Sequence, residues 1–358
     1  MKVSVITACF NAAKTLPRTL ESVWSQVLPD GTELEHIVVD GGSQDGTVEV
    51  LQAFAASKEV DNFRSDATRR RVHEGGGYTF RWLSEKDRGL YDAINKGIRL
   101  ATGDVVGILN ADDWFDGDDV IASVVQTFGE GAVRVTGDCR VEMERCRENV
   151  AGVERVDCVY GDIRFVKVEE RFGGGEKVGT DGRVEGESCR GKFEGLEGFE
   201  GEDGSKSGGR RSAVGCPSSF VGWRAGAKTV RYYSAKRWRP WMFQWGKMPP
   251  HPGVYIRREC FEKYGDYKLG YKIAADYELL VRFLRKHAIR AKYLDKCLVC
   301  MTLGGLSTKN WKSNLLLNQE IVRGNRENGY ACCLPMLLPK YAFKVWEVIL
   351  PRLGVGRG

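Results

Sequence analysis

Short apolar runs alternate with stretches of helical periodicity over the first 128 residues. The apolar runs are rich in β-branched residues and end in polar or glycine-rich turns, as buried strands do. They cover 2–9, 36–40, 80–83 and 105–109. Apolar residues three and four positions apart follow the first three runs and predict helices at 17–27, 47–55 and 90–101. Strands that alternate with helices predict an α/β fold with a mostly parallel sheet covered on both faces.

From about residue 129 to 229 this pattern is lost. Gly, Glu, Arg and Lys dominate, and one apolar run at 156–168 predicts a single core strand. The polar inserts on either side are expected to be disordered, because they hold too little apolar surface to offset the entropy cost of ordering. Periodicity returns at 249–256 and at 276–285, where an amphipathic helix is predicted. Its apolar face consists of Leu279, Leu280 and Phe283.

Composition narrows the class of protein. With 42% hydrophobic and 28% charged residues, the chain of 358 residues is neither fibrous nor wholly disordered. A net charge of +6 suits an anionic ligand or an acidic membrane surface and does not imply nucleic acid. No apolar run reaches the roughly 18 residues that cross a bilayer. The start lacks a signal-peptide pattern, and eleven widely spaced cysteines predict reduced thiols and a cytoplasmic location. Cys297 and Cys300 are expected to be core thiols, since a zinc site needs four ligands.

Carboxylates gather where ligands bind in α/β proteins, at or just past the carboxyl ends of the predicted strands. These residues are Asp40, Asp45, Asp87, Asp112 and Asp113. Taken singly, Asp45, Asp112 and Asp113 fit equally well as turn formers or helix caps. Together with Asn110, the five acids favour a site for a polar ligand or a metal ion.

Several ordered blocks of sequence resemble family 2 glycosyltransferases of the A-type fold. The blocks are 3–7 with Asn11, 38–47, 85–97 and 109–113, and a fifth is 274–278. The resemblance covers roughly 1–128 and 249–300. It implies a nucleotide-binding, mixed but mostly parallel sheet flanked by helices, to which this chain adds a long Gly-rich, charged insert and a C-terminal helical tail.

The resemblance implies that the first two blocks bind a UDP-sugar donor. Asp40 matches the acid that receives the uracil edge, with Thr7 and Asn11 beside the same base and ribose. Asp45 belongs to the same donor-binding block.

The paired acids match the metal-binding motif of the family. Asp113 is expected to hold Mg²⁺ or Mn²⁺ between the two phosphates, and Asp112 to contact the ribose or the sugar. A divalent cation is a common means of neutralising a leaving diphosphate. Asp87 and Arg88 would lie near the donor sugar and phosphates, although an Arg after an Asp is otherwise an ordinary surface ion pair.

On the acceptor side, Asp276 matches the catalytic base of the family, and its structural alternative is a helix N-cap. His251 is expected to be a metal ligand, an acceptor contact or a loop residue. The segment 231–245 alternates basic and aromatic residues, as single-stranded nucleic-acid grooves and sugar sites both do. The sugar site is preferred, with Trp238 and Trp241 as acceptor contacts.

Four regions follow from these patterns. They are a nucleotide-sugar-binding half (1–128), a core strand with flanking inserts (129–229), an acceptor-binding and catalytic-base half (230–305) and a helical tail (306–358). The tail segment 332–350 fits either a helix packed on the domain or contact with an anionic membrane surface, on the cytoplasmic face.

The predicted activity is that of an inverting, metal-dependent glycosyltransferase acting on a glycan or lipid-linked acceptor. A nucleotidyltransferase on a similar sheet is the alternative enzyme, but it is expected to need a basic Gly-rich phosphate loop that the first strand lacks. A non-catalytic protein that binds a sugar or nucleotide is the third interpretation. The metal acids together with Asp276 argue against it.

Overall fold

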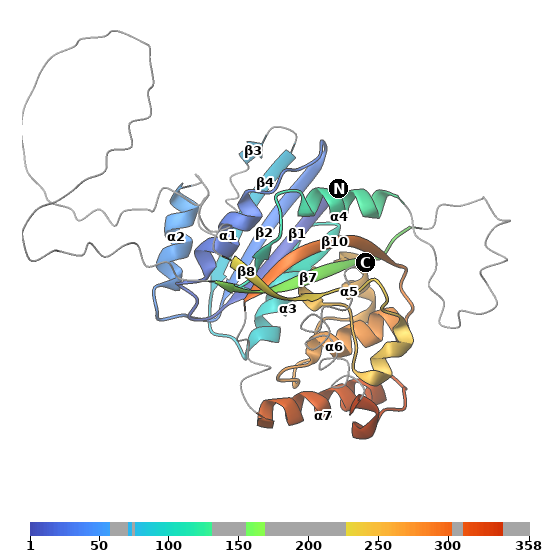
Figure 1. The fold of residues 1–358 in the computed structure, drawn as a ribbon. Coiled ribbons are helices and arrows are strands. Elements are labelled where there is room, and N and C mark those ends of the chain that lie inside the picture. The colour runs from blue at the N-terminus through green and yellow to red at the C-terminus, as the bar shows by residue number, and fades with distance from the viewer. Residues whose placement is uncertain (58–70, 74–75, 131–154, 169–226, 303–310, 339–358) are drawn as a thin grey trace, which may run out of the picture. The chain divides into compact units, whose positions relative to one another are not determined.

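A ten-stranded mixed sheet organises the molecule (Figure 1). The computed structural model describes residues 1–57, 71–73, 76–130, 155–168, 227–302 and 311–338. The chain divides into two units. The first consists of Met1–Lys167 and Lys228–Gly358 and contains the sheet, and the second is Val168–Ala227. The strands are β1 (Lys2–Cys9), β2 (Thr32–Asp40), β3 (Arg71–His73), β4 (Gly76–Ser84), β5 (Val105–Ile108), β6 (Trp114–Phe115), β7 (Cys158–Val168), β8 (Ala227–Tyr233), β9 (Val254–Arg257) and β10 (Ala291–Thr302).

The strand order is β3-β4-β2-β1-β5-β9-β7-β10-β6, with β8 beside β7. The run β4-β2-β1-β5 is parallel throughout. β9 is antiparallel to both of its neighbours, β7 and β10 are parallel, and β3 and β6 are antiparallel additions. The predicted α/β fold with a mixed sheet is therefore confirmed, and its parallel part is the predicted N-terminal half.

Helices cover both faces of the sheet, as predicted. The α-helices are α1 (Leu16–Trp24), α2 (Thr47–Ser57), α3 (Leu90–Leu100), α4 (Val120–Gly129), α5 (Arg258–Tyr264), α6 (Ala275–Leu280) and α7 (Trp311–Glu327). Shorter helical segments are η4 (Pro240–Trp245), η5 (His251–Gly253), the π-helix η6 (Val281–Lys286) and η8 (Leu334–Leu337). Within the described part of the chain, no helix is both long and apolar enough to span a membrane.

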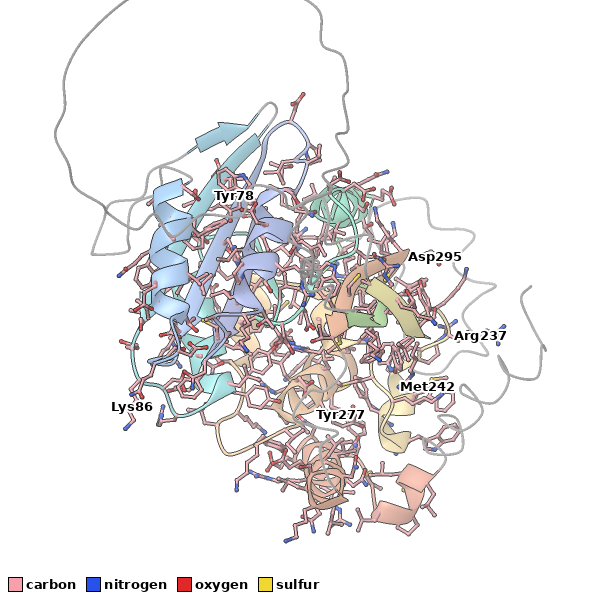
Figure 2. The ribbon with its side chains drawn as sticks, turned by 60° about the vertical axis from the view of Figure 1, so that its left-hand side comes forward. Tyr78, Lys86, Arg237, Met242, Tyr277 and Asp295 are labelled. Carbon is pink, nitrogen blue, oxygen red and sulfur yellow. The ribbon has the colours of Figure 1, made fainter. Side chains whose placement is uncertain are left out.

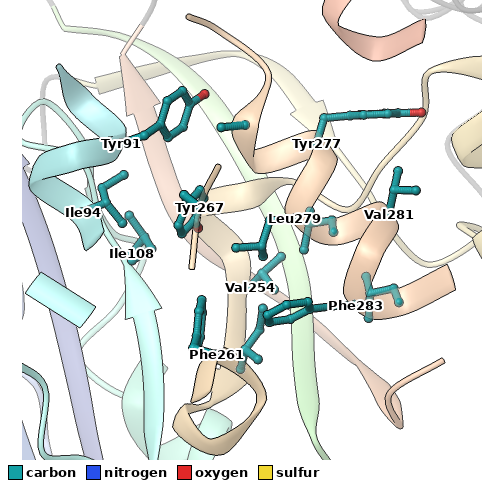
Figure 3. Close-up of a cluster of buried hydrophobic side chains, with 14 of the residues drawn as sticks. Tyr91, Ile94, Ile108, Val254, Phe261, Tyr267, Tyr277, Leu279, Val281 and Phe283 are labelled. Atoms are coloured by element: carbon teal, nitrogen blue, oxygen red, sulfur yellow. The ribbon is translucent and has the colours of Figure 1, made fainter. Parts of the chain in front are cut away.

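Alternate residues of the strands point to opposite faces of the sheet, and a hydrophobic core lies on each face. Val5 and Val38 pack with α1, α2 and α4 on one face of the sheet. Ile6 and Ile37 point to the other face, toward α3, α5 and α6. Figure 3 shows part of this second core, where Ile94 of α3 lies near Ile108 of the sheet. Burial on both faces explains why these strands appear as continuous apolar runs.

The predicted amphipathic helix at 276–285 is corrected in two respects. It is an α-helix that continues as a π-helix, and most of its residues are buried, polar ones included. Glu278 is fully buried and forms an ion pair with Arg282 at 3.2 Å. Arg282 also donates to the carbonyl oxygens of Gly265 and Asp266. The polar side chains that suggested a solvent-facing side thus form their hydrogen bonds and ion pairs inside the protein, where α7 packs against α6.

The strand predicted at 156–168 is confirmed as β7. Most of the two predicted inserts lies outside the described residues, at 131–154 and 169–226. The tail is described only to residue 338, so the predicted membrane contact also lies largely outside them.

Candidate functional site

Topology collects the predicted site loops at one edge of the sheet. β4, β2, β1 and β5 are adjacent and parallel, so the loops that follow them open at the same edge. These loops are 85–89, 41–46, 10–15 and 109–113. β9 runs antiparallel to β5 with Tyr255 opposite Gly107, which brings its beginning, and His251 before it, to this edge. Lys86, in the loop after β4, points outward in Figure 2.

The loop after β1 is hydrogen-bonded to the loop after β2. The Asn11 amide donates to Ser43 Oγ at 2.7 Å, and Asn11 Oδ1 accepts the amide of Gln44 at 3.0 Å. Asp45 Oδ2 accepts the amide of Ala13 at 3.1 Å. Asn11 has a φ of 50°, a left-handed conformation that Asn tolerates better than most residues. The structure therefore joins the loop of Asn11 to the loop of Asp45.

A close approach joins the loops after β2 and β4. A Cβ atom on Gly41 would lie 2.5 Å from Asp87 Oδ2 and 3.3 Å from the ring of Phe10. The absence of a side chain at Gly41 thus lets the Asp87 carboxylate and the Phe10 ring come close to this loop. Phe10 is 63% exposed although it directly follows a buried strand. Sequence analysis missed this aromatic, whose signal was its position at the carboxyl end of β1.

Asp40 and Thr7 differ from their expected roles. Both are fully buried. The carboxylate of Asp40 accepts the amides of Gly42 and Ser43 and the hydroxyls of Ser43 and Ser84. Its oxygens are occupied by the protein, so Asp40 shapes the loop and does not offer a free edge to a base.

The hydroxyl of Thr7 likewise points into the interior. It lies 3.0 Å from His36 Nε2, while His36 Nδ1 lies 3.2 Å from the hydroxyl of Tyr78. Burial lowers the pKa of His36 to about 3, so the ring is neutral at neutral pH. This is a structural link across β1, β2 and β4, and we remove the Thr7 hydroxyl from the donor contacts.

Asp87 and Arg88 remain at the edge of the sheet. Asp87 Oδ1 accepts the amide of Gly89 at 2.8 Å, just before α3 begins. Arg88 has an exposed side chain that forms an ion pair with Asp92 at 3.2 Å. The ordinary surface pair that sequence analysis kept as an alternative is thus present, and the Arg88 fork remains at the surface, open to a further anion.

The acid pair after β5 consists of two unlike carboxylates. Asp113 is 1% exposed, and its Oδ2 accepts a hydrogen bond from Asn110 at 2.9 Å. Burial and the neighbouring Asp112 raise the pKa of Asp113 to about 8. Asp112 is partly exposed, and its Oδ2 accepts the hydroxyl of Thr302 at 3.2 Å. Asp112 is therefore the member of the pair that faces outward.

Oxygen donors of this kind fit a hard divalent cation such as Mg²⁺ or Mn²⁺. A pKa of about 8 leaves Asp113 mostly protonated at neutral pH, and a cation bound beside it would favour the ionised form. Among the described residues no group of three or more His, Cys, Asp and Glu side chains forms a closed metal site. A cation here would need further oxygens from water or from a bound phosphate.

Side chains of α1 donate hydrogen bonds to the backbone of the acid pair. Arg18 donates to the carbonyl oxygen of Asp112 at 3.0 Å, and Thr19 donates to that of Asp113 at 2.7 Å. The Arg18 guanidinium lies 3.6 Å from the ring centre of Trp114. These contacts fix the loop at the end of β5, and sequence analysis did not anticipate them.

Asp276 lies in a pocket of aromatic and imidazole groups. Its Oδ1 accepts the amide of Tyr277 at 2.8 Å and lies 3.5 Å from the hydroxyl of Tyr91. Burial raises the pKa of Asp276 above the usual 3.8, and the nearby His251 opposes that rise. His251 Nε2 lies 2.5 Å from the hydroxyl of Tyr267, whose ring stacks on that of Tyr91.

The N-cap interpretation of Asp276 is wrong. α6 begins at Ala275 and its N-cap is Ala274, so Asp276 lies inside the first turn. Asp276 still accepts the first-turn amide of Tyr277, so it stabilises the start of α6 without being the N-cap. His251 contacts the tyrosine cluster beside Asp276, which favours an acceptor-side position over metal ligation.

The two tryptophans expected at the acceptor site are placed differently. Trp238 is buried, packs edge-on against Tyr160 and Phe243 and donates from Nε1 to the carbonyl oxygen of Lys247. It is a core residue, and its expected role as an acceptor contact is withdrawn. Trp241 is 41% exposed and remains available to a ligand.

A hollow of about 370 Å³ opens beside the start of α3. Arg88 and Tyr91 line one side, and Leu269 and Lys272 line the other. Because Tyr91 also approaches Asp276, the hollow adjoins the surroundings of the candidate base.

The fold and these loops define an α/β protein whose candidate ligand site lies at the carboxyl edge of its parallel strands. Residues 4–170 match the model of glycosyl transferase family 2, and this part of the chain belongs to that family. The family named from the sequence blocks is thereby confirmed.

Curated relatives match the N-terminal part. A glycosyltransferase of Mycobacterium tuberculosis is 38% identical over 132 residues, which are 37% of this chain and 42% of the relative. The PGL/p-HBAD biosynthesis glycosyltransferase of Mycobacterium bovis is 30% identical over 171 residues, 48% of this chain and 50% of the relative. The chain thus spans about half the length of the curated relatives it matches.

Solved structures give more distant likenesses. The mannosyltransferase PcManGT from Pyrobaculum calidifontis, in complex with GDP-Man and Mn²⁺, has a TM-score of 0.49 at 14% identity. The alignment covers 99% of this chain and 76% of PcManGT. S. aureus TarS 1–349, in complex with UDP-GlcNAc, has a TM-score of 0.44 at 15% identity and covers 90% and 67%.

Proposed function

We propose that this protein is an inverting glycosyltransferase that moves a sugar from a nucleotide-sugar, most simply a UDP-sugar, to a hydroxyl of a glycan or lipid-linked acceptor. One observation carries the proposal: Asp276 lies beside Tyr91, next to the family-matched loops at one edge of the sheet. In the sequence, Asp276 lies outside the family-matched residues. We place this reaction on the cytoplasmic side of a membrane, where a lipid-linked acceptor would be reached.

The donor would bind across the loops after β1, β2 and β4. Phe10 offers an exposed aromatic face on which a nucleobase would stack. Asn11 and Asp45 lie beside it, while Asp87 and Arg88 would face the sugar and phosphates. This assignment replaces the expected contacts of Asp40 and Thr7.

We assign the cation to Asp112, and Asp113 supports it from the buried side. This reverses the roles expected from the sequence, because Asp112 is the partly exposed member of the pair and Asp113 is buried. When bound, Mg²⁺ or Mn²⁺ would neutralise negative charge on the leaving diphosphate.

Asp276 would act as general base. As an acceptor oxygen attacks the anomeric carbon and the bond to the diphosphate breaks, the hydroxyl proton passes to the Asp276 carboxylate. A pKa raised by burial makes the ionised Asp276 carboxylate a stronger base than an ordinary aspartate. Trp241, together with the neighbouring Trp245 at 4.8 Å between ring centres, would offer aromatic surface to a sugar acceptor.

The direct test is to screen nucleotide-sugars for release of nucleoside diphosphate, with and without Mn²⁺, in the presence of glycan and lipid-linked acceptors. We expect one donor to be turned over and Asp276→Asn to reduce kcat by about 10²–10⁴-fold with little change in donor KM. Asp295→Asn is the matched control, because the exposed Asp295 contacts only the surface groups Lys236 and the Tyr293 hydroxyl among the interactions described. Release of pyrophosphate from nucleoside triphosphates would instead indicate the nucleotidyltransferase alternative.

A further inference from the structure

We infer that Glu320 of α7 is a positioning residue for Asp276. The inference rests on the proposed function, because it assigns Glu320 a part in the same reaction. Glu320 lies 44 positions beyond Asp276 in the sequence and outside the family-matched residues 4–170.

The Glu320 carboxylate is bound to three consecutive backbone amides. Its Oε1 accepts the amide of Lys272 at 2.7 Å, and its Oε2 accepts those of Ile273 and Ala274, both at 2.9 Å. Asp276 follows two residues later in the first turn of α6. The side chain of Glu320 therefore fixes the backbone segment from which the candidate base projects.

The other side of this segment is held by α3. The Tyr91 hydroxyl donates to the carbonyl oxygen of Ile273 at 2.5 Å and lies close to Asp276 itself. The segment 272–274 is thus fastened through its amides to α7 and through a carbonyl to α3, the helix that follows the donor-side loop. Displacing a reacting group by about 1 Å can lower turnover by about 10²-fold.

Burial makes the Glu320 contact strong. Glu320 is 6% exposed, and hydrogen bonds from amides to an ionised carboxylate are stronger than those between neutral groups. Removing the carboxylate would leave three amides without their acceptor, and the segment would have to move to find another.

Other contacts dock α7 without touching this segment. Glu327 forms an ion pair with Lys268 at 2.9 Å, and Asn328 donates to Glu278 Oε1 at 3.0 Å. Asn325 donates to the hydroxyl of Tyr277 at 3.0 Å. The effect of Glu320 on Asp276 can therefore be separated from the attachment of the helix as a whole.

The experiment is a double-mutant cycle in the full-length protein. Glu320→Ala and Glu320→Gln are measured alone and combined with Asp276→Asn, and Glu327→Gln is the matched control on the same helix. Each variant is characterised by kcat, donor KM and thermal midpoint.

We expect Glu320→Ala to lower kcat by about 10²-fold while donor KM stays unchanged. Glu320→Gln, which keeps one acceptor oxygen, should fall between Ala and the parent. In the Asp276→Asn background neither change should lower kcat much further, because the group being positioned is already lost. Glu327→Gln should leave kcat near that of the parent.

The inference would be overturned if a Glu320 substitution lowered kcat by the same factor in the Asp276→Asn background as in the parent. A kcat that falls only in step with the thermal midpoint would also overturn it. If Glu320→Ala does not fold, Glu320→Gln decides by the same criteria. An Asp276→Asn variant with normal turnover would count against the proposed base itself. Loss of turnover in Asp276→Asn but not in the Glu320 variants would count against positioning alone.

Discussion

At the scale of single residues, the site depends on which side chains reach the surface. Phe10 and Asp112 do so, whereas Thr7, Asp40 and Asp113 are buried beneath them. The buried residues shape the loops, and the exposed ones are left to meet a ligand.

Phe10→Ala should raise donor KM by about 10-fold or more, because stacking on a base contributes roughly 1–3 kcal/mol. Phe10→Trp should keep the parent KM. Val27→Ala alters another exposed apolar side chain, away from these loops, and serves as the control. Steady-state kinetics with varied donor would measure this, and an unchanged KM in Phe10→Ala would exclude stacking on the base.

The acid side of the pH profile should report Asp276. The base works when ionised, so kcat/KM should fall as pH decreases through its pKa, at a pH above that of an ordinary aspartate. Burial lowers the pKa of His251, but its protonated form favours ionised Asp276. Removing His251 should therefore raise the pKa of Asp276.

His251→Gln should therefore move the acid limb to higher pH. The comparison is kcat/KM against pH for both proteins, with His287→Gln, a change at an exposed histidine, as control. An acid limb that stays in place or moves to lower pH in His251→Gln would contradict the electrostatic interaction between His251 and Asp276.

At the scale of elements, glycine and loop contacts decide how closely the strand ends converge. A side chain at Gly41 would need the carboxylate of Asp87 to move. A donor that spans these loops would depend on that spacing.

Gly41→Ala should accordingly push Asp87 and its loop away and raise donor KM, with a smaller effect on kcat. Gly129→Ala is the control, since a Cβ there meets nothing within 4 Å. Both variants should be compared by donor KM and by thermal midpoint. Parent-like KM in Gly41→Ala would show that the loops adjust without affecting the donor.

At the scale of the whole molecule, the His36 link joins three adjacent strands of the sheet. Folding lowers the pKa of His36 from 6.5 to about 3, so between these values the unfolded chain binds a proton that the folded chain does not. The contribution of His36 to the free energy of unfolding is fully present above about pH 6.5. It decreases as pH falls toward 3, by up to about 1.4 kcal/mol per pH unit.

Denaturant unfolding at several values of pH would measure this slope. His36→Phe should lose part of the acid sensitivity, whereas His287→Gln should keep nearly all of it. An equal slope in His36→Phe and the parent would show that other groups cause the acid sensitivity.

The sequence by itself determined the parallel half of the sheet and the position of its loops. Backbone periodicity is local, so continuous apolar runs such as 2–9 and 105–109 identify buried strands, and parallel order sends their carboxyl ends to one edge. The place of Asp45, Asp87 and Asp112 at this edge follows from that rule, whereas Asn11 was named from the family resemblance.

Only the tertiary structure decided which acids are exposed and what holds the candidate base. Burial depends on segments far away in the chain, so Asp112 and Asp113 look alike in sequence yet differ in exposure. Trp238 entered the core because Tyr160 and Phe243 surround it. Glu320 reaches the segment before Asp276 from a separate helix, and no local pattern encodes a contact of that range.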